Sequence, residues 1–166
     1  MRNAFGNYRD IALEVSANPL MGAYLTITGN RAATNAKTAP NENYARELMQ
    51  LFTIGHYELE PDGKRIVNPT TGKYVETYTS DDIFTLARCW TGFSNKAFRR
   101  NIASERTSRG GGAARAKAIN LIDQLQVLPD QRDTNPKTSL GNGYLGGQSV
   151  RVLLHTRACL KMATII

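Results

Sequence analysis

The feature that most constrains this sequence is the apolar period of residues 41–54, "NENYARELMQLFTI". Successive residues of an α-helix are rotated by about 100°, so a helix over this range divides its side chains between two sides. One side would be apolar and buried, and it holds Tyr44, Ala45, Leu48, Met49, Leu51 and Phe52. The other side would be polar, and it holds Glu42, Asn43, Arg46, Glu47, Gln50 and Thr53. Asn41 is placed to cap the start of this helix, and Gly55 is placed to end it.

Two short helices are predicted near the start of the sequence. The first has apolar side chains at helical spacing, namely Phe5, Tyr8, Ile11, Ala12 and Val15. The second begins at Pro19, because proline is favoured in the first turn of a helix and Asn18 can cap that turn. We therefore expect a helical N-terminal region.

Two later segments also have helical spacing. In "YTSDDIFTLARCW", Thr79 and Asp82 can form a capping box, and Ile83 begins an apolar stripe, which together predict a helix over residues 80–91. In "AKAINLIDQLQVL", the apolar positions that recur at helical spacing predict another helix, and they are Ile119, Ile122 and Leu125.

The segment between the 41–54 and 80–91 helices has a different pattern. "HYELEPDGKRIVNPTTGKYVETYT" contains two turn signals, "PDG" and "NPTTGK", separated by alternating apolar and polar residues. Such a pattern predicts one or two small β-hairpins. The expected fold class is therefore mainly α, a helical domain with a small β-hairpin insertion.

The net charge of +7 is concentrated in one short segment. Residues 94–120 hold seven Lys or Arg against one acidic residue, and "RTSRGGGAARAK" within them predicts a basic, Gly/Arg-rich loop over 94–118. Arginines near Phe93 and Phe98 could neutralise phosphates and stack on bases. The candidate anion or nucleic-acid contacts are Arg99, Arg100, Arg106, Arg109 and Arg115. No RNA- or DNA-binding module signature accompanies them, so a solvated loop is the competing interpretation.

Motifs that carry a specific chemistry are absent from the sequence. The two cysteines are 70 positions apart and there are only two histidines, so we expect neither a metal site nor a cofactor. His56 follows Gly55, where a cation could meet the end of the helix dipole. The weak candidates for catalysis are Asn43, Arg46 and Glu47, which share the polar side of the 41–54 helix. Arg46 is also four residues after Glu42, the spacing of an ordinary surface ion pair.

Long apolar segments are absent as well. No stretch approaches the roughly 18 apolar residues of a membrane helix, so we expect no membrane span. The first residues, "MRNAFGNYRDIALEV", lack the apolar segment of a signal peptide. The sequence alone therefore assigns no localisation.

Several motifs together resemble one known family. "NENYARELMQLFTIG", the "PDG" turn, "YTSDDIFTLARCWTGF", "FGNYRDIALEVSANPLMGAYL" and "GYLGG" are similar to DUF1800, a family of mostly bacterial proteins of unknown function. The similarity spans roughly residues 3–147. The resemblance implies a largely helical fold in a protein of several hundred residues. It also implies that many members are exported and encoded beside a sulfatase-like protein, but it brings no catalytic role to Asn43, Arg46 or Glu47.

The resemblance also suggests how the chain is divided. We expect a partial DUF1800-like helical domain over residues 1–147, followed by an atypical tail over 148–166. The sequence begins at motifs that are internal to the family, and the tail departs from the expected pattern. Our hypothesis is therefore that the chain is an internal fragment whose last residues follow a shifted reading frame.

Three functional hypotheses follow, and the reaction or ligand itself stays unknown. The first is a scaffold or interaction module, whose partner would be the rest of a longer parent protein or an exported sulfatase-like protein. The second is an enzyme, for instance a hydrolase, with its site on the polar side of the 41–54 helix. The third is nucleic-acid binding through residues 96–117.

Overall fold

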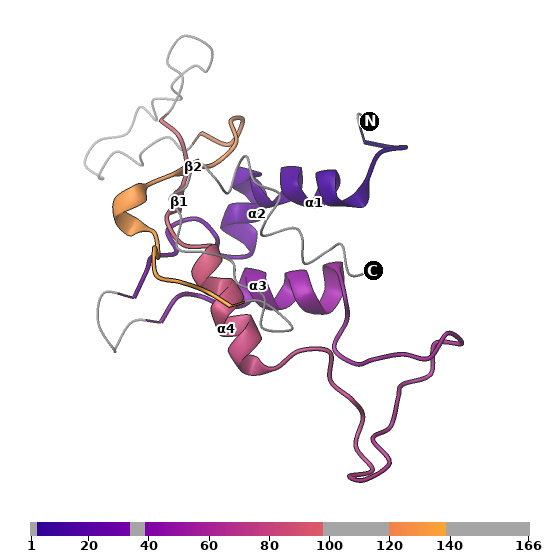
Figure 1. Cartoon of the computed structure of the whole chain (residues 1–166). Coiled ribbons are helices and arrows are strands. Elements are labelled where there is room, and N and C mark those ends of the chain that lie inside the picture. Colours follow the sequence, from indigo (N-terminus) through magenta and orange to yellow (C-terminus); the bar gives the residue numbers. More distant parts are fainter. Residues whose placement is uncertain (1–2, 34–38, 98–119, 139–166) are drawn as a thin grey trace, which may run out of the picture.

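The computed structural model describes residues 3–33, 39–97 and 120–138 (Figure 1). Within them lie four α-helices: α1 (Tyr8–Ser16), α2 (Pro19–Tyr24), α3 (Asn43–Glu47) and α4 (Ser80–Cys89). A π-helical turn, η1 (Leu48–Phe52), continues α3, and a 3-10 turn, η2 (Pro129–Gln131), lies near the end of the described residues. The antiparallel strands β1 (Phe93–Ser94) and β2 (Gln126–Val127) form a two-stranded sheet.

The two N-terminal helices begin at asparagine caps, as the sequence predicts for α2. Asn7 Oδ1 accepts from the N–H of Arg9 at 2.8 Å, and Asn18 Oδ1 accepts from the N–H of Leu20 at 2.8 Å. Pro19 occupies the first turn of α2. These contacts satisfy amide groups that the helix itself leaves without partners. Phe5, however, is fully exposed and lies before α1 rather than within its buried stripe.

The helix predicted over residues 41–54 changes its winding half-way. It is α-helical up to Glu47 and π-helical from Leu48 to Phe52, where it ends. The predicted end, Gly55, follows three residues later with a φ of +75°, and its N–H donates to Met49 O at 2.9 Å. A π-helix advances by a smaller angle per residue than an α-helix, because its hydrogen bonds join residues five apart. The expected burial of Leu51 is therefore wrong, since its side chain is 69% exposed. Tyr44, Ala45, Leu48 and Met49 are buried as expected.

Residues 56–77, which we call the arm, extend away from the four helices (Figure 1). Three backbone hydrogen bonds form a closed cycle in it, from Glu58 N–H to Val75 O, Val75 N–H to Ile66 O, and Ile66 N–H to Glu58 O. The cycle joins three extended segments through turns at Gly63 and Gly72, both with positive φ. The predicted turns are thus in place, but the segments pair through isolated β-bridges and not through regular strands.

Helix α4 follows the arm and begins at the predicted capping box. Thr79 Oγ1 accepts from the N–H of Asp82, and the Asp82 carboxylate accepts from the N–H of Thr79 at 2.8 Å. Ile83 is buried, and so are Leu86 and Ala87 one turn later. Gly92, with a φ of +81°, then turns the chain from α4 into β1.

The helix predicted near residues 119–125 is wrong for the part that the structure describes, residues 120–125. Asn120 Oδ1 accepts from the N–H groups of Ile122 and Asp123 and so closes a local turn. The N–H of Leu125 donates to Ala17 O at 2.8 Å, which removes it from any local helical ladder. A tertiary contact and a side-chain turn therefore replace the helix, and the chain continues into β2.

The core lies where α3, α4 and the loop after α2 meet. Tyr44 packs edge-to-face against Trp90 with ring centroids 4.7 Å apart, and Trp90 packs against Phe93 at 5.6 Å. The buried apolar cluster consists of Leu25, Ile27, Tyr44, Ala45, Leu48, Met49, Tyr78, Ile83, Leu86, Ala87, Cys89, Trp90, Phe93 and Leu125. The predicted fold class is confirmed in its coarse form: helices are the main regular elements described, although the longest, α4, has ten residues.

Candidate functional site

The polar side of α3 lies at the surface, as the sequence predicts. Asn43 is exposed, and its N–H donates to Asn41 Oδ1 at 2.9 Å. Arg46 Nη2 donates to Glu42 Oε1 at 2.7 Å, and both side chains are nearly half exposed. An exposed ion pair of this kind contributes about 0.3–0.5 kcal/mol to stability. The pair therefore has an ordinary structural explanation as a surface ion pair.

Charged side chains of α3 and of the arm both influence the pKa of Tyr78. Burial raises the pKa of its hydroxyl, and the Arg46 cation partly opposes that rise. The carboxylates of Glu47 and Glu76 raise the pKa further, because they disfavour a second negative charge nearby. Two of the three predicted site residues, Arg46 and Glu47, thus influence the pKa of Tyr78.

His56 lies on the arm beside the same tyrosine. Its ring packs edge-to-face against Tyr57 and Tyr78, with centroids 4.4 and 5.5 Å away. Its Nε2 is 3.8 Å from Glu76 Oε1, and both of these side chains are partly exposed. An imidazole beside a carboxylate at the surface can exchange protons with a bound ligand. Sequence reasoning singled out His56 only as a cation at a helix end, and it missed Glu76 altogether.

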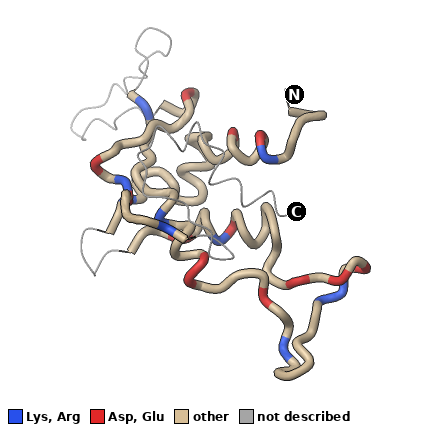
Figure 2. Tube along the Cα trace, viewed as in Figure 1, with Lys and Arg blue, Asp and Glu red and all other residues tan. Residues whose placement is uncertain are grey.

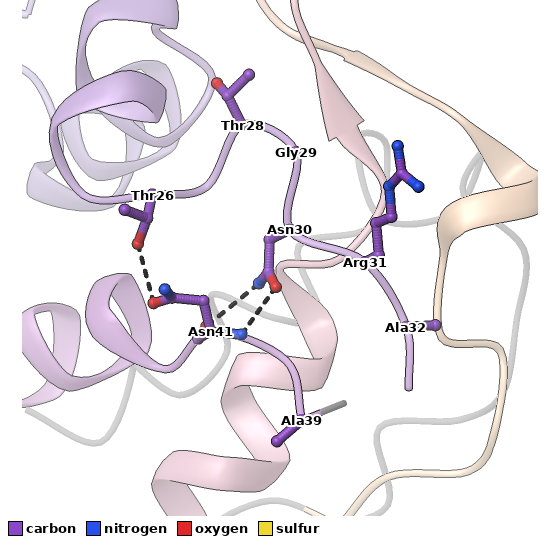
Figure 3. Close-up of a pocket in the computed structure, with 8 residues that line it drawn as sticks. All are labelled: Thr26, Thr28, Gly29, Asn30, Arg31, Ala32, Ala39 and Asn41. Carbon is purple, nitrogen blue, oxygen red and sulfur yellow. Dashed lines mark hydrogen bonds between the residues drawn. The ribbon is translucent and has the colours of Figure 1, made fainter. Parts of the chain in front are cut away.

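A pocket of about 480 Å³ lies between the loop after α2 and the residues before α3 (Figure 3). Its lining is polar or small, and consists of Thr26, Thr28, Gly29, Asn30, Arg31, Ala32, Ala39 and Asn41. The buried Asn30 accepts from the N–H of Asn41 at 2.8 Å and donates to the carbonyl oxygens of Asn41 and Trp90. These bonds fix one wall, whereas Arg31 is exposed and points away from Asn41 (Figure 3). The described lining residues therefore include no converging set of charged groups.

A buried ion network joins α4 to the segment after η2. The guanidinium of Arg88 donates to both carboxylate oxygens of Asp133, at 2.7 and 3.2 Å. Lys137 Nζ donates to the carbonyl oxygens of Asp133 and Asn135, at 2.9 and 2.7 Å. Thr91 Oγ1 accepts from the N–H of Asp133 at 2.8 Å. The network therefore holds α4 and the segment after η2 together.

The candidate nucleic-acid contacts Arg99, Arg100, Arg106, Arg109 and Arg115 all lie outside the described residues. Phe93, the described aromatic residue of that hypothesis, is buried against Trp90 in the core. It is therefore not available to stack on a base. Binding through the rest of the segment stays a prediction.

The described residues hold neither a candidate metal site nor a candidate membrane-spanning helix. No group of three or more His, Cys, Asp or Glu among them is arranged to hold a metal ion. Within the same ranges, no helix has both the length and the apolar character needed to cross a membrane.

Comparisons with known proteins give one match. Neither a curated protein nor a solved structure matches the chain. A family model, described as a protein of unknown function (DUF1800), matches residues 1–161, a longer span than the motifs alone indicated. Because that match covers nearly the whole sequence, the chain belongs to the DUF1800 family.

Proposed function

We propose that this chain is a helical interaction module that binds another protein through apolar side chains of α1 and α2. The observation that carries the proposal is the outer side of α2. Leu20 and Tyr24 lie one turn apart, and they are 58% and 78% exposed. Gly22 lies on the opposite side of the helix, where a Cβ atom would meet Leu125 Cδ1 at 2.8 Å. The helix therefore packs closely at Gly22 and through Met21, and it exposes Leu20 and Tyr24.

Helix α1 also exposes large apolar side chains. Ala12 and Ser16 are buried, whereas Tyr8 is 54% and Ile11 is 36% exposed. The Tyr8 hydroxyl donates to Phe52 O, which fixes the position of the ring. We call Tyr8, Ile11, Leu20 and Tyr24 the α1–α2 surface. Groups of exposed large apolar side chains are typical of surfaces that another protein covers.

The family resemblance supplies two classes of protein partner. One is the exported sulfatase-like protein that many members are encoded beside, and the other is the remainder of a longer parent protein. We take the sulfatase-like protein as the partner, because it can be mixed with this chain as a separate molecule.

The proposal is tested by titrating this chain with a sulfatase-like protein encoded beside a family member, using isothermal calorimetry. We expect saturable binding that Leu20→Asp weakens by at least about tenfold, because a carboxylate would be buried in an apolar contact. Thr70→Asp, an exposed position on the arm, is the matched control and should bind as the natural chain does. Equal binding of the two variants would contradict the proposal.

A second candidate function, an enzyme, is favoured by one specific observation. A π-helical turn, η1, follows α3 immediately and so adjoins Asn43, Arg46 and Glu47 along the chain. Such turns occur often at functional sites. In this alternative Glu47 would accept or donate a proton, Arg46 would stabilise negative charge, and Asn43 would bind the ligand.

The enzyme hypothesis is tested with chromogenic carboxylic, phosphate and sulfate esters. It predicts hydrolysis that Glu47→Gln lowers by at least about 100-fold, the scale of a lost acid–base group. The matched control is Glu60→Gln on the arm, which should leave the rate unchanged. Identical rates for the natural chain and Glu47→Gln would remove this alternative.

A further inference from the structure

The arm has one face on which exposed apolar and aromatic side chains gather. Three β-bridges join its segments, pairing Tyr57 with Glu76, Leu59 with Arg65, and Val67 with Tyr74. Residues directly opposite each other across antiparallel strands point to the same side, and so do residues two apart along one strand. Applied around the cycle of bridges, these two rules place six side chains on one face: Tyr57, Leu59, Arg65, Val67, Tyr74 and Glu76. We call this set the arm face.

Ring contacts agree with that arrangement. The guanidinium carbon of Arg65 is 4.6 Å from the ring centre of Tyr57 and 5.2 Å from that of Tyr74. The two tyrosine rings have centroids 5.5 Å apart. One cation between two rings fixes the centre of the arm face, because each ring attracts the cation.

Three large apolar or aromatic side chains of the arm face are exposed to solvent. Leu59 is 58% exposed, and Val67 and Tyr74 are about half exposed. None of them belongs to the buried apolar cluster of the helices. Tyrosine and arginine are the residue types that contribute most to protein interfaces, and here they are already held in place. The arm face therefore has the composition of a contact surface.

We propose that the arm face pairs with the arm face of a second copy of this chain. The charges favour this occupant. The arm carries both signs of charge (Figure 2), and the arm face itself holds one cation, Arg65, and one carboxylate, Glu76. In a two-fold symmetric dimer the same surface of both copies forms the contact, so this surface must be complementary to itself. Arg65 of each copy then meets Glu76 of the other, and the apolar side chains bury one another.

The size of the arm face predicts that this contact is weak. A stable protein–protein interface usually uses about 20–30 residues on each side, far more than six. We expect a weak dimer, with a dissociation constant on the order of 10–100 μM.

The test is sedimentation velocity of the full chain over a wide concentration range. The mass should rise from that of the 18.3 kDa monomer towards twice that value. Arg65→Glu should weaken dimerisation by at least about tenfold, because it places a second carboxylate against Glu76. The double variant Arg65→Glu with Glu76→Arg should restore the dimer, since it only exchanges the two charges.

Two variants exclude trivial explanations. Val67→Asp should also weaken the dimer, although it leaves the Arg65 contacts in place. If Val67→Asp and Arg65→Glu both weaken dimerisation, misfolding of the Arg65→Glu variant alone cannot explain the loss. Lys64→Glu makes the same change of charge as Arg65→Glu one residue away, at a side chain outside the arm face, and should leave dimerisation unchanged. A monomer at every concentration, or a dimer that Leu20→Asp abolishes and Arg65→Glu does not, would overturn the inference. Neither outcome bears on partner binding by the α1–α2 surface, which the calorimetric titration measures separately.

Discussion

At the scale of single residues, the buried carboxylate of Asp133 accepts hydrogen bonds from Arg88, from Lys137 and from the N–H of Asn135. Burial by itself would raise the pKa of its carboxyl, since a charged group loses hydration. The hydrogen bonds from Arg88 and the nearby Lys137 cation outweigh that effect and hold the pKa below its usual range. The ionised form of Asp133 therefore stabilises the folded chain.

Removing this carboxylate should destabilise the protein strongly. Asp133→Ala leaves the buried Lys137 ammonium and the partly buried Arg88 guanidinium without their shared counter-charge. We expect the free energy of unfolding to fall by about 3 kcal/mol, measured by urea denaturation. Glu42→Ala, which removes the acid of an exposed ion pair, should change it by less than about 0.5 kcal/mol. Similar losses for the two variants would contradict this account of the network.

The lowered pKa of Asp133 also predicts a pH dependence. An acid whose folded pKa is depressed stabilises the protein above its unfolded pKa, about 3.9 for aspartate, and loses that effect as pH falls through the folded value. The stability difference between the natural chain and Asp133→Asn should therefore shrink as pH is lowered from about 5 to about 2. Urea denaturation at a series of pH values measures it. A difference that stays constant over this range would show that the carboxylate is not preferentially ionised in the folded state.

At the scale of elements, the winding of α3 and η1 decides which side chains enter the core. The apolar pattern of residues 41–54 predicts a helix, and it identifies Tyr44, Ala45, Leu48 and Met49 as buried. It does not reveal the change to π-helical winding at Leu48, because both windings use the same residue types. The exposure of Leu51 is the consequence that sequence reasoning missed.

Two leucines on this helix give a direct test of the winding. Leu48→Ala should lower the free energy of unfolding by about 3 kcal/mol, because it leaves a cavity in the core. Leu51→Ala should lower it by less than about 1 kcal/mol, since that side chain is mostly in water. Both values come from urea denaturation of the two variants under the same conditions. A regular α-helix would make the two losses similar, and that result would contradict the structure.

A second pair of variants tests how α4 connects to β1. Gly72→Ala should cost about 1 kcal/mol, because its φ of +67° disfavours a side chain but the space around it is open. Gly92→Ala should cost at least about 3 kcal/mol, since its φ is also positive and a Cβ atom would lie 2.9 Å from Leu128 O. Thermal unfolding of both variants provides the comparison. A smaller loss for Gly92→Ala than for Gly72→Ala would mean that this turn is not packed against Leu128 and Arg132.

Local signals predicted most of the secondary structure, and tertiary contacts explain the exceptions. The Asn18 cap, the Thr79 and Asp82 capping box and the turns of the arm all depend on neighbouring residues, so the sequence reveals them. Residues 120–125 have helical spacing, but a hydrogen bond from Leu125 to Ala17 overrides it. The meeting of Glu76 and His56 with Tyr78 likewise depends on how the arm joins the helices, and no local pattern encodes it.

At the scale of the whole molecule, the described helices and arm leave two apolar surfaces facing solvent. The α1–α2 surface and the arm face lie on different elements. Both hold aliphatic side chains and tyrosine, and the arm face also holds Arg65 and Glu76. The buried ion network and the asparagine wall of the pocket have their partners inside the chain. These observations support the proposed interaction module more than the alternative of a reactive site.

The most direct test of that account is hydrogen–deuterium exchange of the chain alone and with the proposed sulfatase-like partner. Burial of the α1–α2 surface should slow exchange of the amides of α1 and α2 by at least about tenfold, because a covered helix opens less often. The amides around Glu47 in α3 should exchange at an unchanged rate. Protection confined to α3 and His56, with none in α1 and α2, would contradict the account and point instead to the polar site.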